Sequence, residues 1–250
     1  MVKLILLGHG SSKHPESSRS VRAHAEILSR SDQFSQVSCA FLKEEPLVEH
    51  ALDDVGDEKV VIVPDFLAEG YFTRQVIPAK LGAKLLSANV SSAPPVGTHP
   101  MMAELIEAAA REVLGDWDAG QTSVLVIGHG SGKNPCSKQS LLGHLGQMRI
   151  DTDFAQVADL WLEEAPLVSS WRQIANMSRI IVIPYLLNDG QHGGWDIPKE
   201  IGMEVNEDIH DQTHNIEGCE LRLTPALGTS PKFAEVVVQL AQIWGQISEE

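Results

Sequence analysis

The amino-acid sequence predicts an α/β protein made of two similar lobes, each a four-stranded parallel sheet with helices on both faces. Two observations lead to this prediction. The chain repeats itself at a spacing of 120 residues, so one structural unit occurs twice. Within each copy, short β-rich runs alternate with helix-length amphipathic runs, which is typical of parallel strands joined by helices.

The repeat is clearest at a Gly-His-Gly-Ser segment. Adding 120 to a residue number maps Gly8–Ser11 onto Gly128–Ser131 and Ile77-Pro78 onto Ile197-Pro198. No gap is needed from residue 8 to residue 82, where 23 of 75 positions are identical. A duplicated unit is the simplest explanation of this match.

After residue 202 the register slips, because Gly97-Thr98 matches Gly228-Thr229 at a shift of 131. The second copy therefore has about eleven extra residues within 203–227. We place this insert at 203–217, where it contains His210 and His214.

A polar, turn-rich stretch from Leu114 to Thr122 separates the two copies. We therefore predict two domains, at residues 1–115 and 123–250.

Short runs rich in β-branched and apolar residues mark four strands in each copy. The predicted strands are Lys3–Leu7, Gln36–Leu42, Lys59–Val63 and Ser91–Val96, followed by Val124–Ile127, Ala155–Leu162, Arg179–Ile183 and Glu220–Thr224. The last helix is also distinct, since Ser230 and Pro231 are typical of a helix start. After them Phe233, Val236, Val237, Leu240 and Trp244 fall on one helical face.

Composition restricts the class of protein. A content of 43% apolar and 21% charged residues is that of a globular chain, and no apolar run has the length of a membrane helix. The net charge of −15 argues against nucleic acid as a partner. The three cysteines form no C-x-x-C pair, so we expect neither a disulfide framework nor an iron–sulfur cluster, and a cytoplasmic location.

Candidate functional residues follow three strands of the second copy. His129 follows its first strand, Glu163 ends its second, and His192 lies in the loop after its third. If the first strand lies between the other two, these side chains converge at the carboxyl edge of the sheet. Two imidazoles and a carboxylate suit Fe²⁺, Co²⁺ or Ni²⁺, and they suit proton removal near neutral pH equally well.

The first copy has His9, Lys43 and Phe72 at the equivalent positions. Lys43 is a cation and Phe72 has no lone pair, so this set cannot hold a metal in the same way. We therefore predict a degenerate site in the first copy and a working site in the second.

Several of these residues have a purely structural alternative. The glycines of both Gly-His-Gly segments suit a tight strand-to-helix turn, and His9 then only caps a helix. The turns lack the third glycine of a dinucleotide fingerprint and the lysine spacing of a P-loop, so no nucleotide is expected. The matched residues His24 and His144 suit helix packing, and Glu44 and Glu164 suit a surface charge or a helix start. Residues 206–215, with His210 and His214, are interpreted as a polar loop.

Four segments together resemble the class II tetrapyrrole chelatases of the CbiX and SirB type. These are the Gly-His-Gly-Ser turns, the strand ends of the form Phe/Trp-Leu-x-Glu before proline (41–44 and 161–164, the latter with Glu163), His192 with Asp196-Ile197-Pro198, and Gly97-Thr98-His99-Pro100. The resemblance covers nearly the whole chain in two repeats. The first copy departs from the pattern, with Phe72 for the second histidine and Val76 for the aspartate.

The resemblance implies an enzyme that inserts cobalt or iron into sirohydrochlorin without ATP, for cobalamin or siroheme synthesis. It implies His129 and His192 as metal ligands with Glu163 as their catalytic partner. It also implies a macrocycle held between two lobes, near Gly128, Gly130, Ser131 and His9. The alternative is a non-catalytic metal- or tetrapyrrole-binding protein. For either function, we expect a monomer or a homodimer.

An acidic chain requires a local basic lining to bind a tetrapyrrole that carries carboxylates. The candidates follow the two Gly-His-Gly turns, and ordinary surface charge is the alternative for each: Lys13, Arg19, Lys133 and Lys138.

Overall fold

The computed structural model describes residues 1–131 and 135–245 and divides the chain into two compact units. The first unit combines residues 1–99 with the chain from residue 231 onward, and the second consists of residues 100–230. These units do not coincide with the predicted domains 1–115 and 123–250. The last helix of each repeat belongs to the compact unit formed mainly by the other repeat.

The first unit is built on a parallel sheet of four strands in the order β2-β1-β3-β4. The strands are β1 (Val2–Gly8), β2 (Phe34–Phe41), β3 (Val60–Pro64) and β4 (Val90–Ser92). Strand β4 is shorter than predicted, because residues 96–98 form the helical turn η5 (Val96–Thr98).

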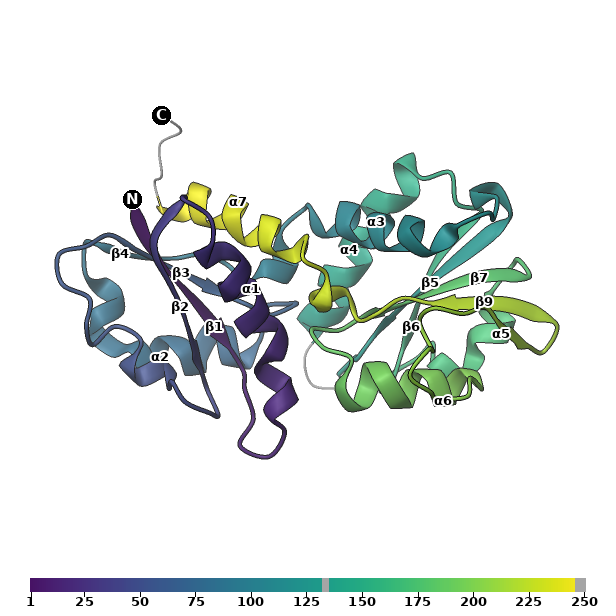
Figure 1. The fold of residues 1–250 in the computed structure, drawn as a ribbon, viewed down its shortest axis with the longest axis horizontal. Helices are drawn as coiled ribbons and strands as arrows, with labels where there is room; N and C mark the ends of the chain where they lie inside the picture. The colour runs from purple at the N-terminus through teal and green to yellow at the C-terminus, as the bar shows by residue number, and fades with distance from the viewer. Residues whose placement is uncertain (132–134, 246–250) are drawn as a thin grey trace. The chain divides into compact units, whose positions relative to one another are not determined.

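Helices cover both faces of this sheet (Figure 1). On one face, α2 (Ile77–Leu81) packs its Ile77 and Leu81 against Ile5 and Leu7 of β1. On the other, α1 (Arg19–Ser29) contacts β2, and α7 (Phe233–Gly245) contacts β3, β4 and α1. Successive side chains of a strand point to opposite faces, so strands covered on both faces are apolar throughout.

Helix α7 docks through its apolar face, as predicted. Phe233, Val236, Val237 and Leu240 are buried, and the ring of Phe233 stacks on buried His24 of α1 at a centroid distance of 4.9 Å. Trp244 differs from the prediction, because it is 46% exposed although it lies one turn after buried Leu240.

The second unit has a mixed five-stranded sheet in the order β6-β5-β7-β9-β8. The strands are β5 (Thr122–Gly128), β6 (Gln156–Trp161), β7 (Arg179–Tyr185), β8 (His214–Ile216) and β9 (Cys219–Leu223). Only β8 is antiparallel, and it pairs with β9. The prediction of a four-stranded parallel sheet is therefore correct for the first unit and incomplete for the second.

The extra edge strand comes from the insert of the second repeat. His214 and Asn215, predicted to lie in a polar loop, are part of β8. A sharp turn at Glu217 and Gly218, both with positive φ, reverses the chain so that β8 lies beside β9. The imidazole of His214 bonds the carbonyl oxygen of Ile209 and that of His210 lies 3.4 Å from the carbonyl of Leu223, so both histidines organise the insert.

The second sheet is also covered on both faces. Helices α5 (Trp171–Ile174) and α6 (Ile197–Ile201) share one apolar cluster with β5, β7 and β9. Helices α3 (Met102–Leu114) and α4 (Pro135–Asp151) contact each other, and α3 also contacts β7 and β9 (Figure 1). No helix in the two described segments is long and apolar enough to cross a membrane.

Arg222 of β9 holds the end of α3 in the second unit. Its guanidinium donates hydrogen bonds to the carbonyl oxygens of Val113 and Leu114, at 3.0 and 2.6 Å. It also bonds the carboxylate of Asp116 and lies 4.0 Å from the ring centroid of Trp117. Unpaired carbonyl groups at the end of a helix are costly, and one arginine satisfies two of them here.

Replacing Arg222 by lysine should destabilise the second unit, because one ammonium group cannot reproduce this planar set of hydrogen bonds. We expect the free energy of unfolding to fall by about 2 kcal/mol in urea titrations of the full chain. The matched control is Arg172→Lys, an exposed arginine of the same unit, which should change it very little. Equal losses in both variants would refute the role assigned to Arg222.

Candidate functional site

Strand β5 lies between β6 and β7, as the site prediction requires. Gly128 at its end pairs with Trp161 of β6 and with Tyr185 of β7. The backbone pairing continues past the strand, since the N–H groups of Leu162 and Glu163 donate to the carbonyl oxygens of Gly128 and His129, both at 3.1 Å. His129 and Glu163 are therefore neighbours because of the backbone register.

The Gly-His-Gly turn needs both of its glycines. A Cβ on Gly128 would lie 2.4 Å from the ring of Trp161, which is closer than real contacts allow. Gly130 has a φ of +78°, a conformation that side chains strongly disfavour. Both positions are thus explained by the turn itself, while contact of Gly128, Gly130 and Ser131 with a tetrapyrrole remains a prediction.

Glu164 fastens this turn to the end of β6. Its carboxylate accepts hydrogen bonds from the backbone N–H of Ser131 at 3.1 Å and from the ammonium of Lys138 at 3.1 Å. The Ser131 bond, followed by the contribution of Lys138, lowers the pKa of Glu164 below its ordinary value. The sequence predicts a surface or helix-start charge for Glu164 and its counterpart Glu44. Their hydrogen bonds to the two Gly-His-Gly turns become evident only in the structure.

The ring of His129 is oriented by the turn. Its Nδ1 lies 2.9 Å from the carbonyl oxygen of Gly130, which can only accept, so Nδ1 carries the proton and Nε2 keeps its lone pair. The Nε2 atom is 3.9 Å from Oε1 of Glu163. The His129 ring stands nearly perpendicular to that of His192, at 87°, with the centroids 4.7 Å apart.

His192 is held by a carboxylate on the same helical turn. It begins η8 (His192–Asp196), and its Nδ1 donates to Oδ2 of Asp196 at 2.7 Å. The amide of Gln191 donates to the other oxygen of Asp196 at 3.0 Å. The Gln191 bond first, and then His192, lower the pKa of Asp196, so its carboxylate is ionised at neutral pH. The Nε2 lone pair of His192 is consequently free for a ligand.

The loop that carries His192 is positioned by the Gly-Thr segment of the second copy. Gly228, in the turn η9 (Leu227–Thr229), donates its N–H to the carbonyl oxygen of Leu186 at 2.9 Å. A Cβ at Gly228 would lie 2.6 Å from the backbone of Leu187. Only glycine permits this approach, so the motif has a supporting role beside the site.

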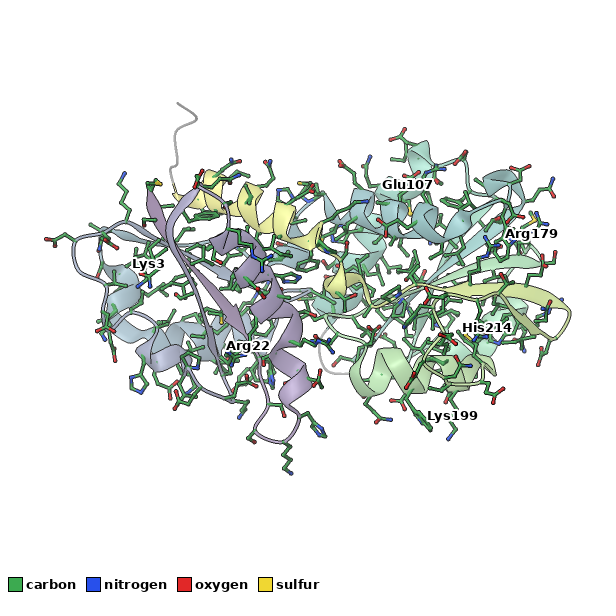
Figure 2. All side chains as sticks on the ribbon, viewed as in Figure 1. Lys3, Arg22, Glu107, Arg179, Lys199 and His214 are labelled. Carbon is green, nitrogen blue, oxygen red and sulfur yellow. The ribbon has the colours of Figure 1, made fainter. Side chains whose placement is uncertain are left out.

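The first copy keeps the same framework with different chemistry. His9 bonds the carbonyl oxygen of Gly10 at 2.8 Å, and its ring meets that of Phe72 at 4.7 Å and 81°. Glu44 accepts the N–H of Ser11, and its second oxygen pairs with Arg22. Arg22 belongs to α1 and is labelled in Figure 2. Lys43 occupies the position of Glu163. The absence of a metal site from this copy stays a prediction.

The second copy thus brings two imidazole rings and one carboxylate close together. Among residues 1–131 and 135–245, no three or more His, Cys, Asp or Glu side chains are close enough to enclose a metal ion. His129 and His192 remain the predicted metal ligands, and the carboxylate of Glu163 lies 3.9 Å from Nε2 of His129. Such an open site leaves coordination positions for a substrate.

The basic lining stays a prediction, and the structure shows only how its candidate residues are paired. Lys138 is engaged by Glu164, and Arg19 forms an exposed ion pair with Glu16. Lys13 is exposed, and Lys133 lies outside the described residues. Trp195, which the sequence did not single out, lies within η8 three residues after His192 and is half exposed.

A known protein family matches the chain twice, once in each repeat. The family model described as CbiX matches residues 3–113 and again residues 123–243, close to the two repeats found by self-comparison. A protein of Halobacterium salinarum named as a probable sirohydrochlorin cobaltochelatase is 31% identical, over 96% of this chain and 91% of its own length. A sirohydrochlorin cobaltochelatase of Methanopyrus kandleri is 30% identical, over 46% of this chain and 99% of its own length.

Solved structures resemble the whole chain. A multi-domain protein of Deinococcus radiodurans with structural similarity to chelatases matches all of this chain with a TM-score of 0.81 and 26% identity, and this chain spans 56% of its length. The CbiX structure from denitrifying bacteria matches 97% of this chain and 99% of its own with a TM-score of 0.72 and 23% identity. The second likeness concerns the fold alone.

Removing the Glu164 carboxylate should disturb the Gly-His-Gly turn and thereby His129. We expect Glu164→Ala to weaken Co²⁺ binding about tenfold in calorimetric titrations, with Glu164→Gln retaining more affinity because its amide oxygen still accepts the Ser131 N–H. The matched control is Glu44→Ala, which breaks the equivalent bond in the first copy and should leave Co²⁺ affinity unchanged. Loss of affinity in that control instead would contradict this role.

Asp196 should affect metal binding, because its carboxylate orients His192 and makes the imidazole a stronger ligand. Asp196→Asn is expected to lower Co²⁺ affinity by about 10- to 100-fold, the usual effect of losing a carboxylate that supports a metal-binding histidine. Asp53→Asn provides the control, since Asp53 forms a similar 2.9 Å contact with exposed His50. If both variants bound Co²⁺ as the wild type does, Asp196 would have no part in metal binding.

Proposed function

The chain belongs to the CbiX family, and on this premise we propose that it is a metal chelatase that inserts a divalent ion, cobalt or iron, into sirohydrochlorin. The product would serve cobalamin or siroheme synthesis. The observation that carries the proposal is the perpendicular pair of His129 and His192, with both Nε2 lone pairs left free. We favour cobalt, because both relatives at 30–31% identity are named as cobaltochelatases.

The histidine pair supplies the metal-binding step. Neutral imidazole is a good ligand for borderline divalent ions such as Co²⁺, Fe²⁺ and Ni²⁺. With only two protein ligands, the ion keeps exchangeable positions that pyrrole nitrogens can occupy one after another. A metal ion that is bound weakly by two histidines is therefore easier to transfer to the macrocycle than to store.

Insertion also requires removal of protons. A divalent ion that enters the macrocycle replaces two pyrrole N–H protons, so charge is balanced when two protons leave. A histidine Nε2 that has released the ion is a suitable base near neutral pH. Glu163, whose carboxylate lies 3.9 Å from Nε2 of His129, provides the next acceptor. No step needs a nucleotide, because metal and protons exchange directly.

Converting the second copy to the arrangement of the first should abolish the activity. In His192→Phe, the ring geometry of the His9 and Phe72 pair is reproduced without the second ligand. We expect at least about a 100-fold loss of cobalt insertion, measured by absorption spectroscopy under anaerobic conditions, with an unchanged unfolding midpoint.

His50→Phe is the matched control, since His50 is an exposed histidine that also pairs with an aspartate. It should retain full activity. Wild-type turnover in His192→Phe would overturn the site assignment. Insertion that stops at one equivalent in the wild type would instead identify a binding protein.

A further inference from the structure

Asp189 fastens the loop that carries His192 to a second segment of the chain. It lies three residues before His192, between the end of β7 and η8. Its Oδ1 accepts a hydrogen bond from the backbone N–H of Ala226 at 2.7 Å. Its carbonyl oxygen accepts the N–H of Gly194, within η8, at 2.8 Å. We refer to the bond between the Asp189 carboxylate and the Ala226 N–H as the loop clasp.

The loop clasp joins the segments that follow two neighbouring strands. Strands β7 and β9 are parallel neighbours (Figure 1), so both segments leave the sheet at its carboxyl edge. The clasp therefore connects residues 37 positions apart in the sequence. The bond from the N–H of Gly228 to the carbonyl oxygen of Leu186 joins the same two segments.

The first copy cannot form this clasp, although it keeps the surrounding backbone. Pro95 stands at the position of Ala226, at the shift of 131 that matches the two Gly-Thr segments, and proline has no N–H to donate. The backbone angles are nearly the same, with φ −58° and ψ 144° at Pro95 and φ −56° and ψ 136° at Ala226. The bond from the N–H of Gly97 to the carbonyl oxygen of Phe66 is also kept, at 2.8 Å.

The carboxylate of the first copy has a local partner instead. Glu69, at the position of Asp189, forms an ion pair with Arg74 of its own loop. The second copy has Gly194 in place of Arg74, so this position offers no cation to its carboxylate. The two substitutions act together: one copy binds its carboxylate within the loop, and the other binds it to the segment after β9.

The clasp is present in the copy whose loop carries the second histidine. Two ligands of one ion must hold their nitrogen atoms at defined positions, whereas the Phe72 ring of the first copy has no such requirement. The side chain of His192 is 48% exposed, so packing alone fixes it poorly. The bonds among Gln191, His192 and Asp196 lie within one helical turn and move with it. A contact from outside the loop is needed to fix this turn relative to the sheet.

We propose that Asp189 is a positioning residue for metal binding, whose clasp to the Ala226 N–H holds His192 where it shares an ion with His129. The proposal rests on the proposed function for the role of the two histidines as metal ligands. Asp189 acts through the backbone of the loop, and its carboxylate is occupied by Ala226 rather than by the ion.

The first test removes the acceptor of the clasp. Asp189→Ala should weaken Co²⁺ binding to the full chain about tenfold in calorimetric titrations, because a charge-assisted hydrogen bond that fixes the loop is lost. The visible d–d absorption of the bound Co²⁺ should change toward that of the His192→Ala protein. Asp189→Asn should restore both affinity and spectrum, since its amide oxygen still accepts the Ala226 N–H.

The second test removes the donor. Ala226→Pro deletes the N–H at a residue whose φ of −56° already suits proline, and it reproduces the Pro94-Pro95 pair of the first copy. It should weaken Co²⁺ binding about as much as Asp189→Ala does. Pro95→Ala is the matched control, because it creates the equivalent N–H in the first copy and should leave Co²⁺ affinity unchanged.

The double variant Asp189→Ala, Ala226→Pro separates the clasp from two independent effects. Both substitutions remove the same bond, so the double variant should bind Co²⁺ no more weakly than either single variant. Additive losses would overturn the proposal. So would wild-type Co²⁺ affinity and spectrum in Asp189→Ala, even with a reduced free energy of unfolding, because the clasp would then only stabilise the fold.

Failure of the proposed function gives a different result. A wild type that binds Co²⁺ through the histidine pair, and inserts none into sirohydrochlorin, would remove the chelatase activity and leave the role of Asp189 intact.

Discussion

The central position of β5 between β6 and β7 is the constraint on which the candidate site depends. Parallel pairing brings the ends of the three strands to one edge, with Gly128 opposite both Trp161 and Tyr185. Because the pairing continues into the turn, His129 and Glu163 are adjacent without any help from their side chains. The remaining candidate ligand, His192, comes from the loop after β7. Hydrogen bonds to Gly130 and Asp196 then set which nitrogen of each ring is free.

The two repeats show how one framework can support two kinds of chemistry. Both have a histidine in a Gly-His-Gly turn, a glutamate that fastens this turn, and a second ring at 4.7 Å. At the candidate site the two copies differ in side chains at the edge of the sheet, with Lys43 in place of Glu163 and Phe72 in place of His192. A framework fixed by backbone hydrogen bonds tolerates such changes, because the exchanged groups do not support the fold.

Features of the fold that depend on local sequence patterns could be predicted from the sequence. Strand positions follow from apolar runs, and the meeting of three strand ends follows from parallel pairing. Other features depend on long-range packing. The amphipathic pattern of α7 predicts a helix but does not say which sheet it covers, and the hold of Arg222 on α3 joins residues more than 100 positions apart. The strand β8 is too short for its sequence to be distinguished from a loop.

The most direct test of the central claim is X-ray absorption spectroscopy of the protein loaded with one equivalent of Co²⁺. Imidazole rings give a characteristic multiple-scattering signal, so the ligands of the ion can be counted. The account predicts two imidazole ligands in the wild type and one in each of the variants His129→Ala and His192→Ala. Two imidazoles that persist in both variants, or coordination by oxygen alone in the wild type, would contradict it.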